Sequence, residues 1–180
     1  MYTSERIAAA HAAWIDTYVA LDWNPYLLTF KFNPIPGSER RVEKVMRGEI
    51  ERGYAILLTR AIRRPRSVGQ QGNLPIWICC FDMPVFKRAK QSIRDILPND
   101  GRHIHATLLM PPWSRLEDVE EHFVRLQNVY IGASAALAAI DCVPVTRTPG
   151  YAHQYVMKAV LNGRLDEASW FVLPKSLSEL

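Results

Sequence analysis

The 180-residue chain is poor in cysteine and has no long apolar run. Its three cysteines are an odd number, and the neighbours Cys79 and Cys80 cannot readily bridge each other in an extended segment, which argues against a secreted disulfide scaffold. Segment 7–21 is interrupted by His11 and Asp16, lacks the basic flank of a signal peptide, and is shorter than the roughly 20 apolar residues that span a bilayer. We therefore expect a cytoplasmic protein with no membrane partner.

The chain also lacks an internal repeat, and its prolines and glycines follow no period, so solenoid and collagen-like architectures are excluded. With 48% hydrophobic and 22% charged residues it can bury an ordinary core, and disordered or low-complexity classes fit poorly. Lys and Arg number 22 and Asp and Glu number 18, which gives a net charge of +4. This balance favours a polyanionic partner without proving one.

Hydrophobic periodicity predicts an alternation of helices and strands. Apolar residues at three- and four-residue steps predict helices over 4–21, 39–63, 85–97, a segment after Ser114 and 151–161, with Ser4, Ser38 and Ser114 as N-caps. Ser114 and Glu117 have the spacing of a capping box. Alternating or β-branched runs predict strands over 26–33, 76–83, 102–110 and 138–146. The order favours an α+β fold, a central antiparallel sheet of about four to five strands with helices packed on one side.

The strongest candidates for chemistry are His103 and His105. Residues two apart in a strand project from the same face, so both imidazoles point one way while Ile104 points into the core. Such a pair can clamp a divalent metal. The alternative is two histidines at a strand end that bind nothing, because this spacing often occurs by chance.

A second pair, Tyr155 and Lys158, lies three residues apart in a predicted helix and therefore shares a helix face. A nucleophile and a cation are thus adjacent. Taken alone, a tyrosine and a lysine at this spacing are usually solvated surface residues. We expect the two histidines to lie on a central strand and to face the helix that carries Tyr155.

Taken together, these motifs resemble those of the HUH endonucleases, a family of rolling-circle replication initiators, relaxases and related transposases. The family pattern of His, a bulky hydrophobic residue, His and further hydrophobics is matched by HIHATLL at 103–109, where Thr107 is the one imperfect position. The family's Tyr-hydrophobic-x-Lys motif is matched by YVMK at 155–158, and residues 27–30 are similar to its first motif. The resemblance covers residues 26–162. We therefore divide the chain into an N-terminal helical extension (1–25), an HUH-type nickase domain (26–165) and an irregular tail (166–180).

The resemblance implies a metal-dependent single-stranded DNA endonuclease and strand transferase that initiates rolling-circle replication or mobilisation. Tyr155 would attack the phosphodiester and leave a 5′-phosphotyrosine, while Mg²⁺ or Mn²⁺ held by His103 and His105 polarises the scissile phosphate. Lys158 would either favour the phenolate form of the tyrosine or neutralise the phosphate.

Two imidazoles do not complete a site for a hard metal, so a third ligand is needed. Related initiators often take a carboxylate from the neighbouring strand, and Asp82 is the best-placed candidate; its alternative role is N-cap of the helix at 85–97. His153 and Gln154 are weaker candidates for the third metal ligand than Asp82. Tyr151, four residues before Tyr155, is a possible second nucleophile or simply a packing residue.

Basic and aromatic residues suggest how single-stranded DNA would be held. Aromatic candidates for base stacking are Trp77, Trp113 and Tyr130. Cations that could track the backbone are Arg63, Arg64, Arg66, Lys87 and Arg88. The alternative interpretation is that these basic residues only form part of the solvated surface.

Two other functions compete with the nickase. A non-catalytic nucleic-acid-binding module could use a similar sheet without turnover. The 2H phosphoesterases use His-x-Thr followed by hydrophobics, which residues 105–109 match, but those enzymes need two copies and the chain has no second one.

Overall fold

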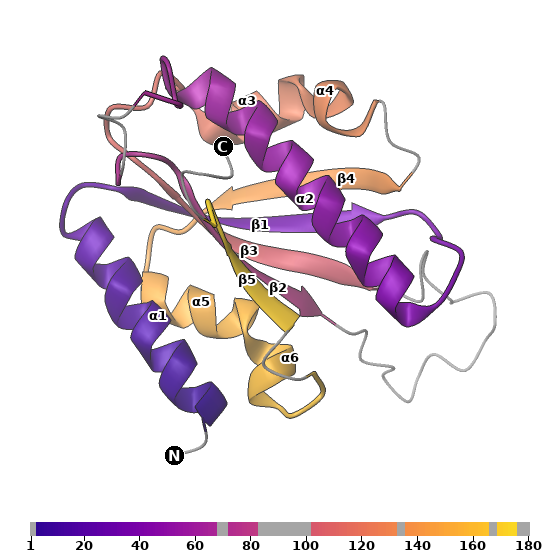
Figure 1. Cartoon of the computed structure of the whole chain (residues 1–180). Coiled ribbons are helices and arrows are strands. Elements are labelled where there is room, and N and C mark those ends of the chain that lie inside the picture. Colours follow the sequence, from indigo (N-terminus) through magenta and orange to yellow (C-terminus); the bar gives the residue numbers. More distant parts are fainter. Residues whose placement is uncertain (1–2, 68–71, 83–101, 133–135, 166–168, 176–180) are drawn as a thin grey trace.

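The computed structural model describes residues 3–67, 72–82, 102–132, 136–165 and 169–175, and within them it has one five-stranded sheet with helices on both faces (Figure 1). The strands are β1 (Asn24–Phe32), β2 (Ile76–Asp82), β3 (His103–Met110), β4 (Leu137–Pro144) and β5 (Trp170–Leu173). Their order is β4-β1-β3-β2-β5, and every neighbouring pair is antiparallel. The predicted α+β class and antiparallel sheet are therefore confirmed.

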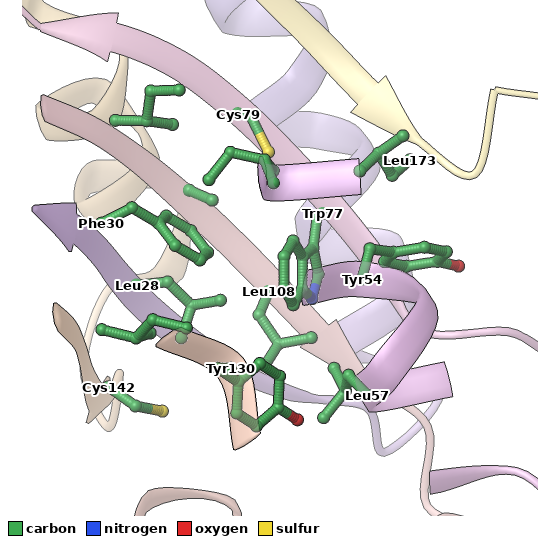
Figure 2. Close-up of a cluster of buried hydrophobic side chains, with 14 of the residues drawn as sticks. Leu28, Phe30, Tyr54, Leu57, Trp77, Cys79, Leu108, Tyr130, Cys142 and Leu173 are labelled. Atoms are coloured by element: carbon green, nitrogen blue, oxygen red, sulfur yellow. The ribbon is translucent and has the colours of Figure 1, made fainter. Parts of the chain in front are cut away.

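One face of the sheet forms the main core. Alternate residues of the strands, such as Phe30, Trp77 and Leu108, pack against the helices α2 (Glu39–Ala61), α3 (Val119–Arg125) and α4 (Gln127–Ile131) (Figures 1 and 2). Ile104 belongs to this core and is fully buried, as the two-residue strand period predicts.

The opposite face is covered by α1 (Thr3–Val19), α5 (Pro149–Val156) and α6 (Lys158–Leu161) (Figure 1). Ile15 of α1 packs with Ile78 of β2 and Leu109 of β3, and Val156 of α5 packs with Cys80 of β2. The expectation that helices lie on one side only is thus wrong. Strands β2 and β3 are buried on both faces along almost their whole length, so elements must cover each face of the sheet.

Local signals misplaced several boundaries. Ser4 lies inside α1, which includes Thr3 before it, so Ser4 is not the N-cap of that helix. The helix α3 begins only at Val119, where the Asp118 side chain accepts a 2.8 Å hydrogen bond from the backbone N–H of Glu121. Ser114 instead accepts the backbone N–H of Leu116 within a turn. A carboxylate nearer the apolar stripe has taken the place of the expected capping box.

Two further predictions concern the C-terminal part. The helix expected over 151–161 is two short helices, because the backbone leaves helical geometry at Met157. The segment expected to be irregular contains β5, which pairs with β2 along Trp77–Cys80 and extends the sheet beyond it. Ser38 stands at the predicted N-cap position of α2, but its side chain makes no capping hydrogen bond. The predicted helix at 85–97 lies outside the described residues.

Candidate metal centre and tyrosine site

The sheet brings three metal-ligating side chains together at one end of β2 and β3. His103 and His105 lie on the same face of β3, the central strand, and Asp82 is the register partner of His103 on β2. The three ligand atoms lie within 4.8 Å of one another. Asp82, chosen from sequence as the third ligand, is therefore in place beside both histidines.

The spacing of the donor atoms suits a single ion. Nε2 of His103 lies 3.0 Å from Nε2 of His105. Oδ2 of Asp82 lies 3.3 Å from the first of these nitrogens and 3.5 Å from the second. Octahedral bonds of about 2.1 Å would place adjacent ligands about 3.0 Å apart, and tetrahedral bonds of that length about 3.4 Å. The three residues could therefore hold one metal ion, which would keep further coordination positions for other ligands.

The protonation states of the ligands also suit a cation. Burial alone would raise the pKa of Asp82, but the hydrogen bonds from His103, His105 and Lys158 hold it well below the usual range of an aspartate. Burial lowers the pKa of His105, and this outweighs the opposing effect of Asp82. Near neutral pH the site therefore offers an ionised carboxylate and a neutral imidazole at His105, the forms that bind metals.

One carboxylate oxygen of Asp82 receives no hydrogen bond from the described residues. Its side chain is buried, and Oδ1 has no hydrogen-bonding partner within the part of the chain that the structure describes. A buried carboxylate oxygen without a partner is costly, and a bound cation would compensate it. The residues present therefore fit a divalent metal.

Lys158 connects this group to the tyrosine. Its Nζ lies 2.7 Å from Oδ2 of Asp82 and 4.2 Å from the ring centroid of Tyr155. Partial burial alone would lower the pKa of the lysine, but the hydrogen bond to Asp82 raises it above the ordinary value, so the ammonium stays charged. The predicted shared face of Tyr155 and Lys158 is found despite the break between α5 and α6.

Tyr155 stands at the edge of the ligand group and faces solvent. Its ring centroid lies 5.1 Å from that of His105, and 47% of the residue is exposed. The predicted placement of the histidines on a central strand, facing the helix of this tyrosine, is therefore found. Tyr151 lies one helical turn earlier and is 72% exposed, so it does not serve as a packing residue.

Sequence reasoning missed a buried polar contact beside the site. His153, considered only as a weaker metal ligand, does not belong to the metal-ligand group and is fully buried, with Nδ1 2.9 Å from Oγ1 of Thr107. Its Nε2 lies 3.2 Å from Nδ1 of His11 on α1. Two signals pointed to it: Thr107 is the polar interruption of the 103–109 string, and His11 interrupts an apolar helix face.

The predicted nucleic-acid contacts lie elsewhere. Trp113 follows the far end of β3, and the eight residues of that strand place its two ends about 23 Å apart. Arg63 lines an open cavity of about 510 Å³ with Trp113, and Arg64 and Arg66 belong to the same turn after α2. Trp77 and Tyr130 are fully buried, so neither can stack on a base. Lys87 and Arg88 lie outside the described residues.

Comparisons of the chain with models of protein families, with curated proteins and with solved structures found no match. Among the described residues, none of the helices combines the length and the apolar character needed to cross a membrane.

Proposed function

We propose that the chain is a metal-dependent single-stranded DNA endonuclease and strand transferase with Tyr155 as its nucleophile. The observation that carries this proposal is the position of a solvent-facing tyrosine beside a three-residue metal-ligand group, with a charged lysine in contact with both. The resemblance of the two short motifs to those of the replication initiators agrees with this arrangement.

The metal would be held by Asp82, His103 and His105, and when bound it would polarise the scissile phosphate and offset its developing charge. Two imidazoles in the ligand set favour Mn²⁺ over Mg²⁺, because imidazole suits transition metals better than it suits a hard cation. Three protein ligands would leave further coordination positions on the metal for phosphate oxygens and water.

The chain's own residues would carry out the transfer. The Tyr155 oxygen attacks phosphorus, a tyrosyl O–P bond forms, and the bond from phosphorus to the 3′ oxygen breaks. The phenol proton is lost to solvent, which reaches the half-exposed side chain, and the leaving 3′ oxygen takes up a proton to become a hydroxyl. The ammonium of Lys158 stabilises the phenolate before attack and the charged phosphate during it.

The exposed Tyr151 supports a second transfer. Its position one turn before Tyr155 would allow it to attack a second strand while the first remains linked. The attachment of DNA at Tyr155 conserves the energy of the phosphodiester, so a later attack by a free 3′-hydroxyl rejoins strands without a nucleotide cofactor. The DNA backbone would also contact the basic turn with Arg63, Arg64 and Arg66, and a base would stack on Trp113.

Formation of a covalent adduct tests the proposal. The protein is incubated with a pool of single-stranded oligonucleotides and Mn²⁺, and the products are separated under denaturing conditions and weighed as intact species. We expect a tyrosine-linked oligonucleotide in the parent and in Tyr151→Phe, and none in Tyr155→Phe, which keeps the ring but lacks the attacking oxygen. DNA binding without any adduct from the parent would instead favour the non-catalytic binding module. An adduct that persists in Tyr155→Phe and is lost in Tyr151→Phe would move the nucleophile to Tyr151.

A further inference from the structure

A partly buried series of polar contacts links the N-terminal helix α1 to the helix that carries Tyr151 and Tyr155. Nδ1 of His11 lies 3.2 Å from Nε2 of His153, and Nδ1 of His153 lies 2.9 Å from Oγ1 of Thr107. His153 is fully buried between these two partners. A neutral imidazole has one donor and one acceptor nitrogen. Both nitrogens of His153 are therefore satisfied whichever of them carries the proton.

The polar contacts between His11, His153 and Thr107 fix the position of α5 along β3. Thr107 and His105 are two residues apart on one face of the strand, which separates their side chains by about 6.6 Å along it. His153 makes a polar contact with Thr107, and the ring of Tyr155 contacts the ring of His105. The contact at Thr107 therefore sets the register that places the tyrosine ring over the metal-ligand group.

Other contacts enclose His11. The ring of Trp170 on β5 meets it edge-on at 4.6 Å between centroids, and His153 meets it edge-on at 5.1 Å. Near the start of α5, a Cβ built on Gly150 would lie 3.3 Å from Cβ of Ala12, so α1 and α5 approach closely there. With α1 held on one side and β3 on the other, His153 has little freedom to move.

We propose that His11 is a positioning residue for the nucleophile, acting through His153 and Thr107 to hold Tyr155 beside the metal-ligand group. The N-terminal helix is then a working part of the site rather than an extension of it. This inference rests on the proposed function, because it assigns to His11 the placement of the attacking tyrosine.

Two substitutions at position 11 separate the polar contact from packing. His11→Asn keeps a donor and acceptor close to the place of Nδ1, whereas His11→Leu keeps bulk but leaves Nε2 of His153 without its partner. Ile15→Val is the matched control, because Ile15 is a fully buried residue of α1 that packs on β2 and β3 and is not part of the series of polar contacts. Urea unfolding of all variants shows how much stability each one loses.

The first readout is the single-turnover rate of adduct formation at saturating oligonucleotide and Mn²⁺. We expect this rate to fall roughly tenfold to a hundredfold in His11→Leu and to recover most of the loss in His11→Asn, with unchanged DNA and Mn²⁺ affinities. Equal rates in the parent and His11→Leu would overturn the positioning role. So would an equal fall in Ile15→Val, or a loss in His11→Leu that His11→Asn does not rescue.

The second readout needs neither metal nor DNA. A single 3-fluorotyrosine at position 155 gives a ¹⁹F resonance whose shift depends on the nearby His105 ring and Lys158 ammonium. We expect this shift to move toward the unfolded-chain value in folded His11→Leu and to stay near the parent value in His11→Asn and Ile15→Val. An unchanged shift in His11→Leu would overturn the inference. If the parent forms no adduct, the proposed nickase fails, while the ¹⁹F shift still decides whether His11 positions the tyrosine.

Discussion

Lys158 forms an ion pair with Asp82 across the interface between α6 and the sheet, at 2.7 Å between Nζ and Oδ2. The carboxylate that pairs with the lysine is the same one that completes the metal-ligand group. A bound cation and the ammonium therefore share one oxygen-bearing side chain, and each weakens the hold of the other on it.

This sharing predicts opposite effects of Lys158→Met on metal binding and on chemistry. Mn²⁺ should bind several-fold more tightly, up to roughly tenfold, because a competing positive charge has been removed. Adduct formation should fall, because no ammonium then stabilises the phenolate or the phosphate. Calorimetric titration with Mn²⁺ and the adduct assay measure the two effects.

Lys175→Met is the matched control for this substitution. It removes the same charge from an exposed ion pair with Glu51 and should change neither quantity. Weaker Mn²⁺ binding in Lys158→Met would show that the lysine supports the site instead of competing with the ion.

Asp82→Asn should remove most of the affinity for Mn²⁺. The substitution keeps the shape of the side chain but deletes the negative charge and one anionic ligand, so we expect a loss of at least about a hundredfold. Mn²⁺ should also raise the melting temperature of the parent and not that of the variant, because an ion that binds only the folded chain stabilises it.

Asp141→Asn serves as the comparison for this prediction. Asp141 is an exposed carboxylate paired with Lys31, and its loss should leave Mn²⁺ binding intact. DNA affinity should survive in both variants, because metal binding and backbone attraction are separate contributions. Retention of parent-like Mn²⁺ affinity in Asp82→Asn would place the metal elsewhere.

The basic turn after α2 should contribute to the salt dependence of DNA binding. The test is a triple variant with Arg63→Gln, Arg64→Asn and Arg66→Gln. Asn is chosen at position 64 because that residue has φ +72°, a left-handed conformation that Asn tolerates. The log–log slope of affinity against salt should flatten by about 0.7 for each phosphate of the single strand that the turn no longer neutralises.

Arg125→Gln is the control for the triple variant, since Arg125 is an exposed cation that pairs with Glu121. Fluorescence anisotropy of a labelled oligonucleotide over a range of salt concentrations measures the slopes. An unchanged slope in the triple variant would assign the turn to solvated surface.

The buried His153 should make stability depend on pH in the acid range. Burial, with a smaller effect of His11, lowers the pKa of His153 from 6.5 to about 3. Between these values the unfolded chain binds a proton that the folded chain excludes, so the free energy of unfolding falls as the pH is lowered from about 6.5 to about 3. The total loss from this residue should be about 3–5 kcal/mol.

Urea unfolding at several pH values checks this prediction. In His153→Gln the dependence on pH should become shallower by up to about 1.4 kcal/mol per pH unit within that window, even though the variant is less stable near neutral pH. The same slope in parent and variant would mean that other groups account for the acid sensitivity.

Much of the candidate site follows from local periodicity. Because a strand repeats every two residues, His103 and His105 had to share a face and Ile104 had to leave it. Because a helix turn takes between three and four residues, Tyr155 and Lys158 had to be neighbours, and the change of geometry at Met157 did not separate them. The class of fold followed in the same way from the order of elements.

The pairing of elements was decided only by the tertiary structure. The register of β2 on β3 places Asp82 opposite His103, and a shift by one residue would have turned its carboxylate to the other face. Likewise, β5 forms only because β2 offers an edge to it, and four residues carry too little local signal to show this.

The N-terminal helix also shows which features follow from local periodicity and which depend on tertiary packing. The sequence by itself predicted an amphipathic helix over residues 4–21, close to the observed Thr3–Val19, because helical periodicity depends on neighbours along the chain. That His11 would meet His153, 142 positions away, depended on how two helices pack on one sheet. A single polar residue in an apolar stripe shows that a partner is needed, but only packing over long sequence separations selects the partner.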